Sequence, residues 1–88
     1  MTEQWSPLQF GMQHFPAGPI AGERFRATAT DFGTCAEVLC WFPGCGFSPK
    51  SFMFESMAQA KAAGEAYVRS EGAEVPRPTL TMREAVAC

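Results

Sequence analysis

The stretch RFRATATDFGTCAEVLCWF, residues 24–42, decides the fold because it holds two alternating runs of residues on either side of one turn. Small apolar residues alternate with arginine and threonine up to Thr30, and a second alternating run begins at Cys35. Alternation with a period of two is typical of a β-strand with one buried face. The residues between the runs, DFGT at 31–34, are turn formers. The stretch therefore predicts an antiparallel β-hairpin.

A two-residue loop at Phe32 and Gly33 gives the expected register of this hairpin. It pairs Asp31 with Thr34 and, further along, Arg24 with Trp41. One face of the hairpin is then wholly apolar and suits a core. The other face carries a mixed set of side chains: Arg24, Arg26, Thr28, Thr30, Cys35, Glu37, Leu39 and Trp41.

The residues that follow predict a third strand and one amphipathic helix. Residues 51–55, SFMFE, alternate with their two phenylalanines toward the core. Ser56 opens a capping-box pattern, so we expect a helix from Met57 to Ser70, ended by Gly72. Its inward stripe has helical spacing and consists of Met57, Ala60, Gly64, Tyr67 and Val68. The missing side chain of Gly64 would let helix and sheet approach closely.

Both ends of the chain give weaker signals. Residues 5–15 alternate weakly, which suggests a strand with Leu8, Phe10 and Met12 on one side, although Gly11 weakens it. Residues 75–78 form a proline-containing connector, and a second capping-box pattern at 81–84 predicts a short terminal helix of about seven residues. We therefore expect one α+β domain over residues 1–74, a small antiparallel sheet of three to four strands with one helix on one face, followed by a tail over residues 75–88.

Length and charge exclude several classes of protein. A chain of 88 residues supports one hydrophobic core. A net charge of −2, from seven basic and nine acidic residues, favours neither a general nucleic-acid binder nor a polyanionic mimic. No segment approaches the roughly 20 apolar residues that span a bilayer, and the first residues do not have the pattern of a secretory signal. The sequence predicts a cytoplasmic protein that does not bind membranes.

The cysteines predict neither a metal site nor a catalytic thiol. Cys35, Cys40 and Cys45 recur every five residues, whereas structural zinc sites space their cysteines about two to four residues apart. The odd separation of Cys35 and Cys40 places them on opposite faces of one strand. No cysteine-enzyme signature surrounds Cys45, the loop thiol that His14 would have to activate. We expect these three and Cys88 to be reduced thiols, and we expect no cofactor and no enzymatic activity.

The sheet face away from the helix is the predicted working surface. Leu39, Trp41 and Met53 would lie together on it, and monomeric proteins seldom leave such a cluster in water. Tryptophan and arginine are enriched at binding hot spots. The predicted partner-binding residues are Arg24, Arg26, Leu39, Trp41 and Met53. An alternative of equal weight is that the N-terminal segment covers this face with Trp5, Leu8 and Phe10.

The arrangement of hairpin, third strand and capped helix, with ESMAQAKAAGEA at 55–66, resembles that of many short accessory proteins of phages and plasmids. Some proteins of this style, anti-CRISPR proteins among them, inhibit host machinery by occupying a partner's surface. The resemblance implies no functional residues. The leading hypothesis is a non-enzymatic protein-binding module, monomeric or homodimeric, that docks on a larger protein or complex. The alternatives are a nucleic-acid-binding accessory protein that stacks Arg24 and Arg26 on single strands, and a cysteine-based metal or redox protein.

Overall fold

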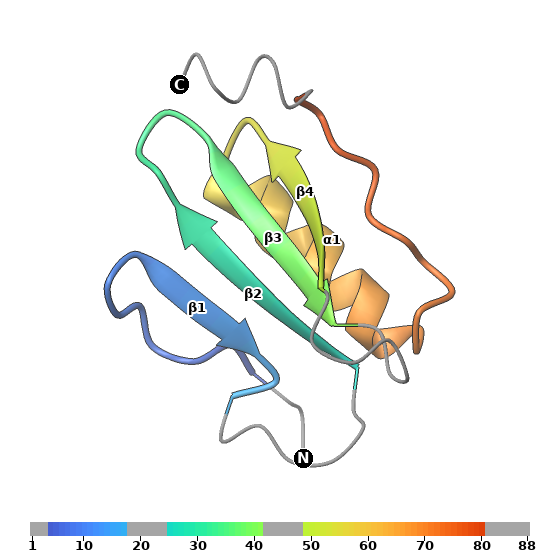
Figure 1. Ribbon diagram of the computed structural model, residues 1–88. Coiled ribbons are helices and arrows are strands. Elements are labelled where there is room, and N and C mark those ends of the chain that lie inside the picture. The colour runs from blue at the N-terminus through green and yellow to red at the C-terminus, as the bar shows by residue number, and fades with distance from the viewer. Residues whose placement is uncertain (1–3, 18–24, 42–48, 81–88) are drawn as a thin grey trace.

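A four-stranded antiparallel sheet carries one helix across one of its faces (Figure 1). The computed structural model describes residues 4–17, 25–41 and 49–80. The strands follow one another in chain order, and the elements are β1 (Met12–Phe15), β2 (Arg26–Asp31), β3 (Ala36–Trp41), β4 (Lys50–Phe54) and α1 (Met57–Arg69). The predicted α+β class is confirmed. The terminal helix expected after residue 80 lies outside the described residues.

The start and the buried face of α1 follow from the sequence. The Ser56 hydroxyl accepts a hydrogen bond from the backbone N–H of Gln59 at 3.2 Å, and the Gln59 side-chain oxygen accepts one from the N–H of Glu55 at 3.1 Å. These bonds occupy N–H groups that have no partner within the helix. The predicted stripe is confirmed, because Met57 packs against the core and the other four members are buried: Ala60, Gly64, Tyr67 and Val68.

Gly64 is the point of closest approach between α1 and the sheet. A Cβ atom placed on it would lie 2.9 Å from the Cβ of Ala27 and 2.9 Å from the Cγ2 of Val38. Both separations are shorter than non-bonded carbon atoms tolerate. The expected role of this glycine in helix–sheet packing is therefore confirmed.

Replacing Gly64 with alanine is expected to destabilise the fold by about 1–2 kcal/mol, because overpacking outweighs the gain of about 1 kcal/mol in helix propensity. Urea denaturation gives the free energy of unfolding. The matched control is Ala62→Gly at an exposed position of the same helix, which should cost about 1 kcal/mol from propensity alone. A Gly64→Ala variant more stable than the wild type would contradict the close approach.

The helix ends one residue earlier than expected, in a Schellman motif. The N–H of Gly72 donates to the carbonyl of Tyr67 at 2.9 Å, and the N–H of Glu71 donates to that of Val68 at 3.1 Å. The left-handed position usually taken by glycine in this motif is occupied by Glu71, whose φ is 52°. Gly72 follows with φ 87°, and a Cβ there would lie 2.7 Å from the Cε1 of Phe25.

Glu71→Gly is expected to raise the free energy of unfolding by about 1 kcal/mol, because glycine adopts the left-handed conformation without the steric cost that other residues incur. Thermal and urea denaturation both measure it. Gly72→Ala is the opposite control and should destabilise the fold, since its side chain would strike Phe25. Lower stability of Glu71→Gly would show that the glutamate side chain stabilises the helix end.

The hairpin of β2 and β3 has a different register from the expected one. Asp31 pairs with Ala36 and Arg26 pairs with Trp41, so the prediction was wrong by two residues. The turn is centred on Gly33 and Thr34, because a carboxylate oxygen of Asp31 accepts the N–H of Gly33 at 2.8 Å and Gly33 has a φ of 93°. A shift of two residues leaves every side chain on its predicted face.

The expected strand over residues 5–15 is present only in part, as β1, because the residues before Met12 form a tight turn and run back beside it. Gln9 and Met12 exchange two backbone hydrogen bonds of 3.0 and 2.9 Å around Phe10 and Gly11. Both central residues have positive φ, 53° and 75°, as in a type I′ turn. The chain before the turn runs back along β1, where the N–H of Ser6 donates to the carbonyl of His14 at 2.9 Å.

Both outer strands of the sheet are joined to further segments. Residues 4–9 lie beside β1, as described above. On the other side, the N–H groups of Thr79 and Leu80 donate to the carbonyl of Met53 at 3.0 and 3.2 Å, and the Thr79 hydroxyl accepts the N–H of Glu55 at 3.0 Å. Covered edges oppose strand-to-strand association with other chains.

Candidate functional site

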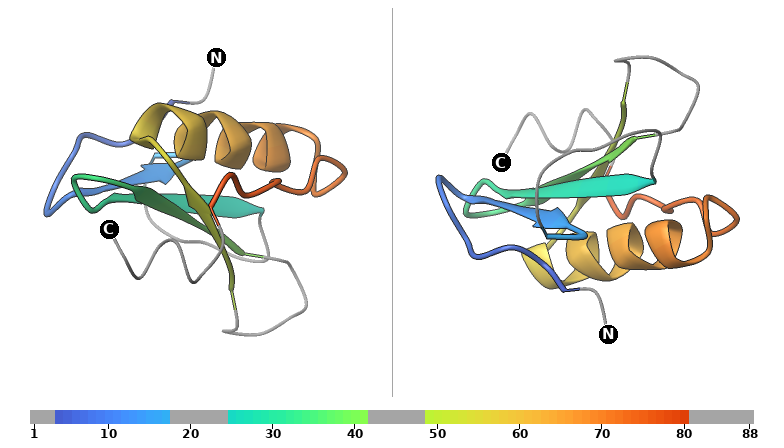
Figure 2. Two further views of the ribbon diagram at one scale, coloured as in Figure 1. Left: turned by 90° about the horizontal axis from the view of Figure 1, so that it is seen from above. Right: turned by 90° about the horizontal axis from the view of Figure 1, so that it is seen from below.

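The face of the sheet opposite α1 brings together most of the predicted partner-binding residues. Arg26 lies directly across from Trp41, and Glu37 directly across from Met53. Leu39 lies between these rows. Figure 2 shows α1 on one side only of the sheet, which leaves these side chains on the other. Arg24 lies outside the described residues.

The side chains of this face differ in how much of their surface is exposed to solvent. Arg26 is 8% exposed and Met53 is 6% exposed, so both side chains are buried within the chain itself. Leu39 and Trp41 are partly buried and keep some surface toward solvent. Among the described members of the predicted set, these two side chains are therefore the accessible ones, and they stand two residues apart on β3.

The backbone of Trp41 is held from the helix side of the sheet. The hydroxyl of Tyr67, a fully buried residue of α1, donates to the carbonyl of Trp41 at 2.9 Å. The indole Nε1 of Trp41 is inaccessible and has no hydrogen-bond partner among the described residues. A bond from the core thus fixes where the strand presents its tryptophan.

Tyr67→Phe is expected to lower the free energy of unfolding by about 1–2 kcal/mol, because it leaves the carbonyl of Trp41 without its donor while it keeps the aromatic packing. Urea denaturation measures the loss. Tyr67→Ala also creates a cavity and should cost about 3–5 kcal/mol. If the phenylalanine variant were as stable as the wild type, the hydrogen bond would not be what secures Trp41.

Four polar residues of this face form two hydrogen-bonded pairs. The Nδ1 atom of His14 lies 2.9 Å from the hydroxyl of Thr28, and the hydroxyl of Ser51 donates to Glu37 at 2.6 Å. Thr28 is buried, so a substrate cannot reach its hydroxyl beside the imidazole. These bonds stabilise the sheet face and leave its apolar side chains as the groups available for binding.

The two described cysteines lie on different sides of the sheet, as the spacing predicted. Cys40 belongs to the core under α1, whereas Cys35 is buried just before β3 and is not part of that core. Burial raises the pKa of the Cys40 thiol from 9.0 to about 12. Within residues 4–17, 25–41 and 49–80, no three histidine, cysteine, aspartate or glutamate side chains gather as a metal site. Cys45 and Cys88 lie outside these ranges.

Cys40 is expected to resist iodoacetamide at pH 8 in the folded protein and to react fully after denaturation, because only the thiolate is nucleophilic. Mass spectrometry of the peptide that contains Cys40 measures this. The raised pKa also predicts a pH effect. The stability from this buried thiol is fully present below pH 9 and is lost as the pH rises toward 12, since only the unfolded chain ionises in that window. Labelling of native Cys40 as fast as that of the denatured chain would contradict its burial.

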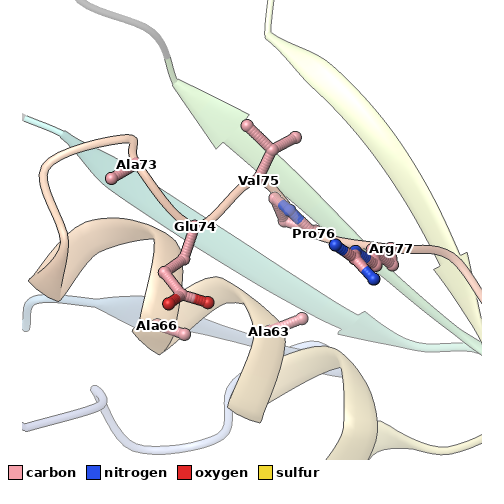
Figure 3. A pocket seen from close by; sticks show the side chains of 7 residues that line it. All are labelled: Ala63, Ala66, Ala73, Glu74, Val75, Pro76 and Arg77. Atoms are coloured by element: carbon pink, nitrogen blue, oxygen red, sulfur yellow. The ribbon is translucent and has the colours of Figure 1, made fainter.

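A shallow groove of about 670 Å³ lies between α1 and the segment that follows it (Figure 3). Ala63 and Ala66 line its helix side, and residues 73–77 line the other. Its charged groups are the exposed Glu74 and Arg77, so no buried polar side chain marks a ligand position. We assign no ligand to it.

Trp5 lies on the helix side of the sheet, and Leu8 and Phe10 are exposed, so these three side chains do not cover the predicted working face. The Trp5 indole donates to Glu65 at 3.1 Å, its ring lies 5.2 Å from that of Phe15, and the ammonium of Lys61 lies 5.5 Å from it. The alternative in which Trp5, Leu8 and Phe10 shield the opposite face is therefore wrong for this segment.

Sequence reasoning missed a group of exposed apolar side chains at the turns. Phe10 is 99% exposed, Leu8 60% and Phe32 55%. A signal was present, since the dipeptide Phe-Gly occurs at both tight turns. It was missed because Leu8 and Phe10 were assigned to a strand.

Comparison of the chain with models of protein families, with characterised proteins and with solved structures finds no match. No helix among the described residues has the length and apolar character needed to span a bilayer.

Proposed function

We propose that this protein is a non-enzymatic binding module that docks on a larger protein through the sheet face opposite α1. The observation that supports it is the pair of partly accessible apolar side chains, Leu39 and Trp41, on that face. Tryptophan is one of the three residue types enriched at binding hot spots.

The pair is supported by a rigid strand. β3 is hydrogen-bonded to β2 on one side and to β4 on the other, and Tyr67 holds the carbonyl of Trp41. Side chains on an ordered strand lose little freedom when they dock, so more of the contact energy is retained as affinity. Arg26, the cross-strand neighbour of Trp41, is buried and so forms part of the rigid sheet on which the tryptophan stands.

We infer an inhibitory role, in which the module occupies a surface that its partner needs. The support is the resemblance of the hairpin, third strand and capped helix to short accessory proteins of phages and plasmids, which include anti-CRISPR proteins. The nucleic-acid alternative gains no support from the described residues, because Arg26 is too buried to reach a phosphate.

The test is affinity capture from the source organism, followed by titration of the purified partner with the wild type and with Leu39→Ala and Trp41→Ala. We expect each substitution to weaken binding by at least about tenfold, since each removes an anchor. The free energy of unfolding is measured for every variant, and binding is compared at a temperature where all are folded. Gln59→Ala on the exposed side of α1 is the matched control and should bind normally.

The salt dependence of binding distinguishes protein binding from nucleic-acid binding. An apolar interface should change little in affinity between low and high salt, whereas phosphate contacts weaken steeply. A fluorescent single-stranded oligonucleotide tests the alternative directly. Normal partner binding by both variants would contradict the proposed face.

A further inference from the structure

The two Phe-Gly turns lie at the same end of the sheet (Figures 1 and 2). The N–H of Asp31 donates to the carbonyl of Gly11 at 2.7 Å, which ties the strands together there. Phe10 directly precedes Gly11 and Phe32 directly follows Asp31, so both lie just outside β1 and β2, one residue beyond the bonded pair. With Leu8, which precedes the first turn, they form what we call the turn-end patch.

The turn-end patch is unfavourable for folding in two ways: its apolar side chains are exposed to water, and Phe10 has a backbone conformation that phenylalanine disfavours. Phe10 is 99% exposed, and Leu8 and Phe32 are each more than half exposed. Phe10 also adopts a φ of 53°, in a turn position where asparagine, aspartate or glycine is favoured. A bulky residue with positive φ is an outlier, and such outliers concentrate at functional sites. Asparagine here would serve folding better than phenylalanine.

Among the described residues, the charged side chains at the ends of the strands here are acidic. Asp31 ends β2 and is exposed, and Glu55 follows β4 and is exposed. Basic residues of the described strands and helix lie elsewhere: Lys50 starts β4, Arg69 ends α1, and the Lys61 ammonium lies 5.5 Å from the ring of Trp5. An apolar patch with carboxylates beside it complements an apolar pocket with lysine or arginine at its rim.

We propose that the turn-end patch is a second docking site, and that its occupant is a protein with an apolar pocket rimmed by basic residues. Phe10 is the central anchor, and Leu8 and Phe32 are further exposed apolar side chains at the same end of the sheet. This site is separate from Leu39 and Trp41 and does not depend on them. The two hydrogen bonds that close the turn at Gln9 and Met12 hold the anchor in place before binding.

Two other occupants fit the patch less well. Anionic membranes attract clusters of lysine and arginine, whereas this end carries carboxylates. A second copy of the chain would bring Asp31 of one copy against Asp31 of the other, and like charges brought together across an interface are destabilising.

The experiment places the photo-reactive residue p-benzoylphenylalanine at position 10 of the full chain and irradiates cells of the source organism. The cross-linked protein is purified and titrated with the wild type and with Phe10→Asn, Phe10→Tyr, Asp31→Asn and Trp41→Ala.

Phe10→Asn should weaken binding by about 30-fold or more while it raises Tm by about 4 °C, so that lost binding cannot be attributed to unfolding. Phe10→Tyr retains the aromatic ring and should bind within a few-fold of the wild type. Asp31→Asn keeps an oxygen for Gly33 and should weaken binding about threefold or more at low salt.

Retained binding in Phe10→Asn, or the absence of any cross-linked protein, would overturn the proposal. Phe10-dependent binding to vesicles of phosphatidylcholine and phosphatidylserine, without a protein partner, would overturn it in favour of a lipid surface. A dimer that Phe10→Asn dissociates would overturn it in favour of a second copy. Binding that is lost in Phe10→Asn and kept in Trp41→Ala supports this site and shows that it acts independently of the sheet face. The reverse result contradicts this site and supports the sheet face.

Discussion

The close approach of α1 to the sheet at Gly64 is the contact on which the rest of the structure depends. Small side chains make it possible, since the fully buried Ala27, Ala29 and Ala36 cover the sheet beneath the helix. Because the helix lies so near, the hydroxyl of Tyr67 reaches the backbone of Trp41 at the end of β3. A domain with one helix and one sheet has a single core layer, so a change in this spacing alters every contact across that layer.

The periodicity of the sequence predicted which side chains face the core. The choice of buried face is the feature of the fold that depends most directly on periodicity. The alternation around Thr28 and Val38 and the helical stripe through Tyr67 specify faces, and burial of apolar area makes those faces strongly preferred. Register and turn position depend on smaller energies. The hydrogen bond from the N–H of Gly33 to the Asp31 carboxylate places the turn one residue later than predicted. Phe10 and Gly11 form a turn although the asparagine or aspartate typical of such turns is absent.

The candidate site could be predicted only in part for the same reason. Strand parity correctly placed Arg26, Leu39, Trp41 and Met53 on one face, because alternation is a property of the strand itself. Parity does not determine how much of that face the rest of the chain buries. Arg26 and Met53 proved to be buried, whereas Phe10 proved to be fully exposed. Such differences arise from tertiary packing, which local patterns do not contain.

The covered edges of the sheet restrict how this protein can recognise a partner. Addition of a partner strand needs free backbone N–H and carbonyl groups along an outer strand. Residues 4–9 lie along β1, and the backbone of Thr79 and Leu80 occupies the carbonyl of Met53 on β4. These contacts leave little of either edge for an added strand, which favours recognition through side chains on the sheet face or at its turns. Side-chain anchors read the shape and charge of a particular pocket, whereas a strand edge pairs with almost any extended chain. The architecture thus favours a specific partner over general association with exposed strands.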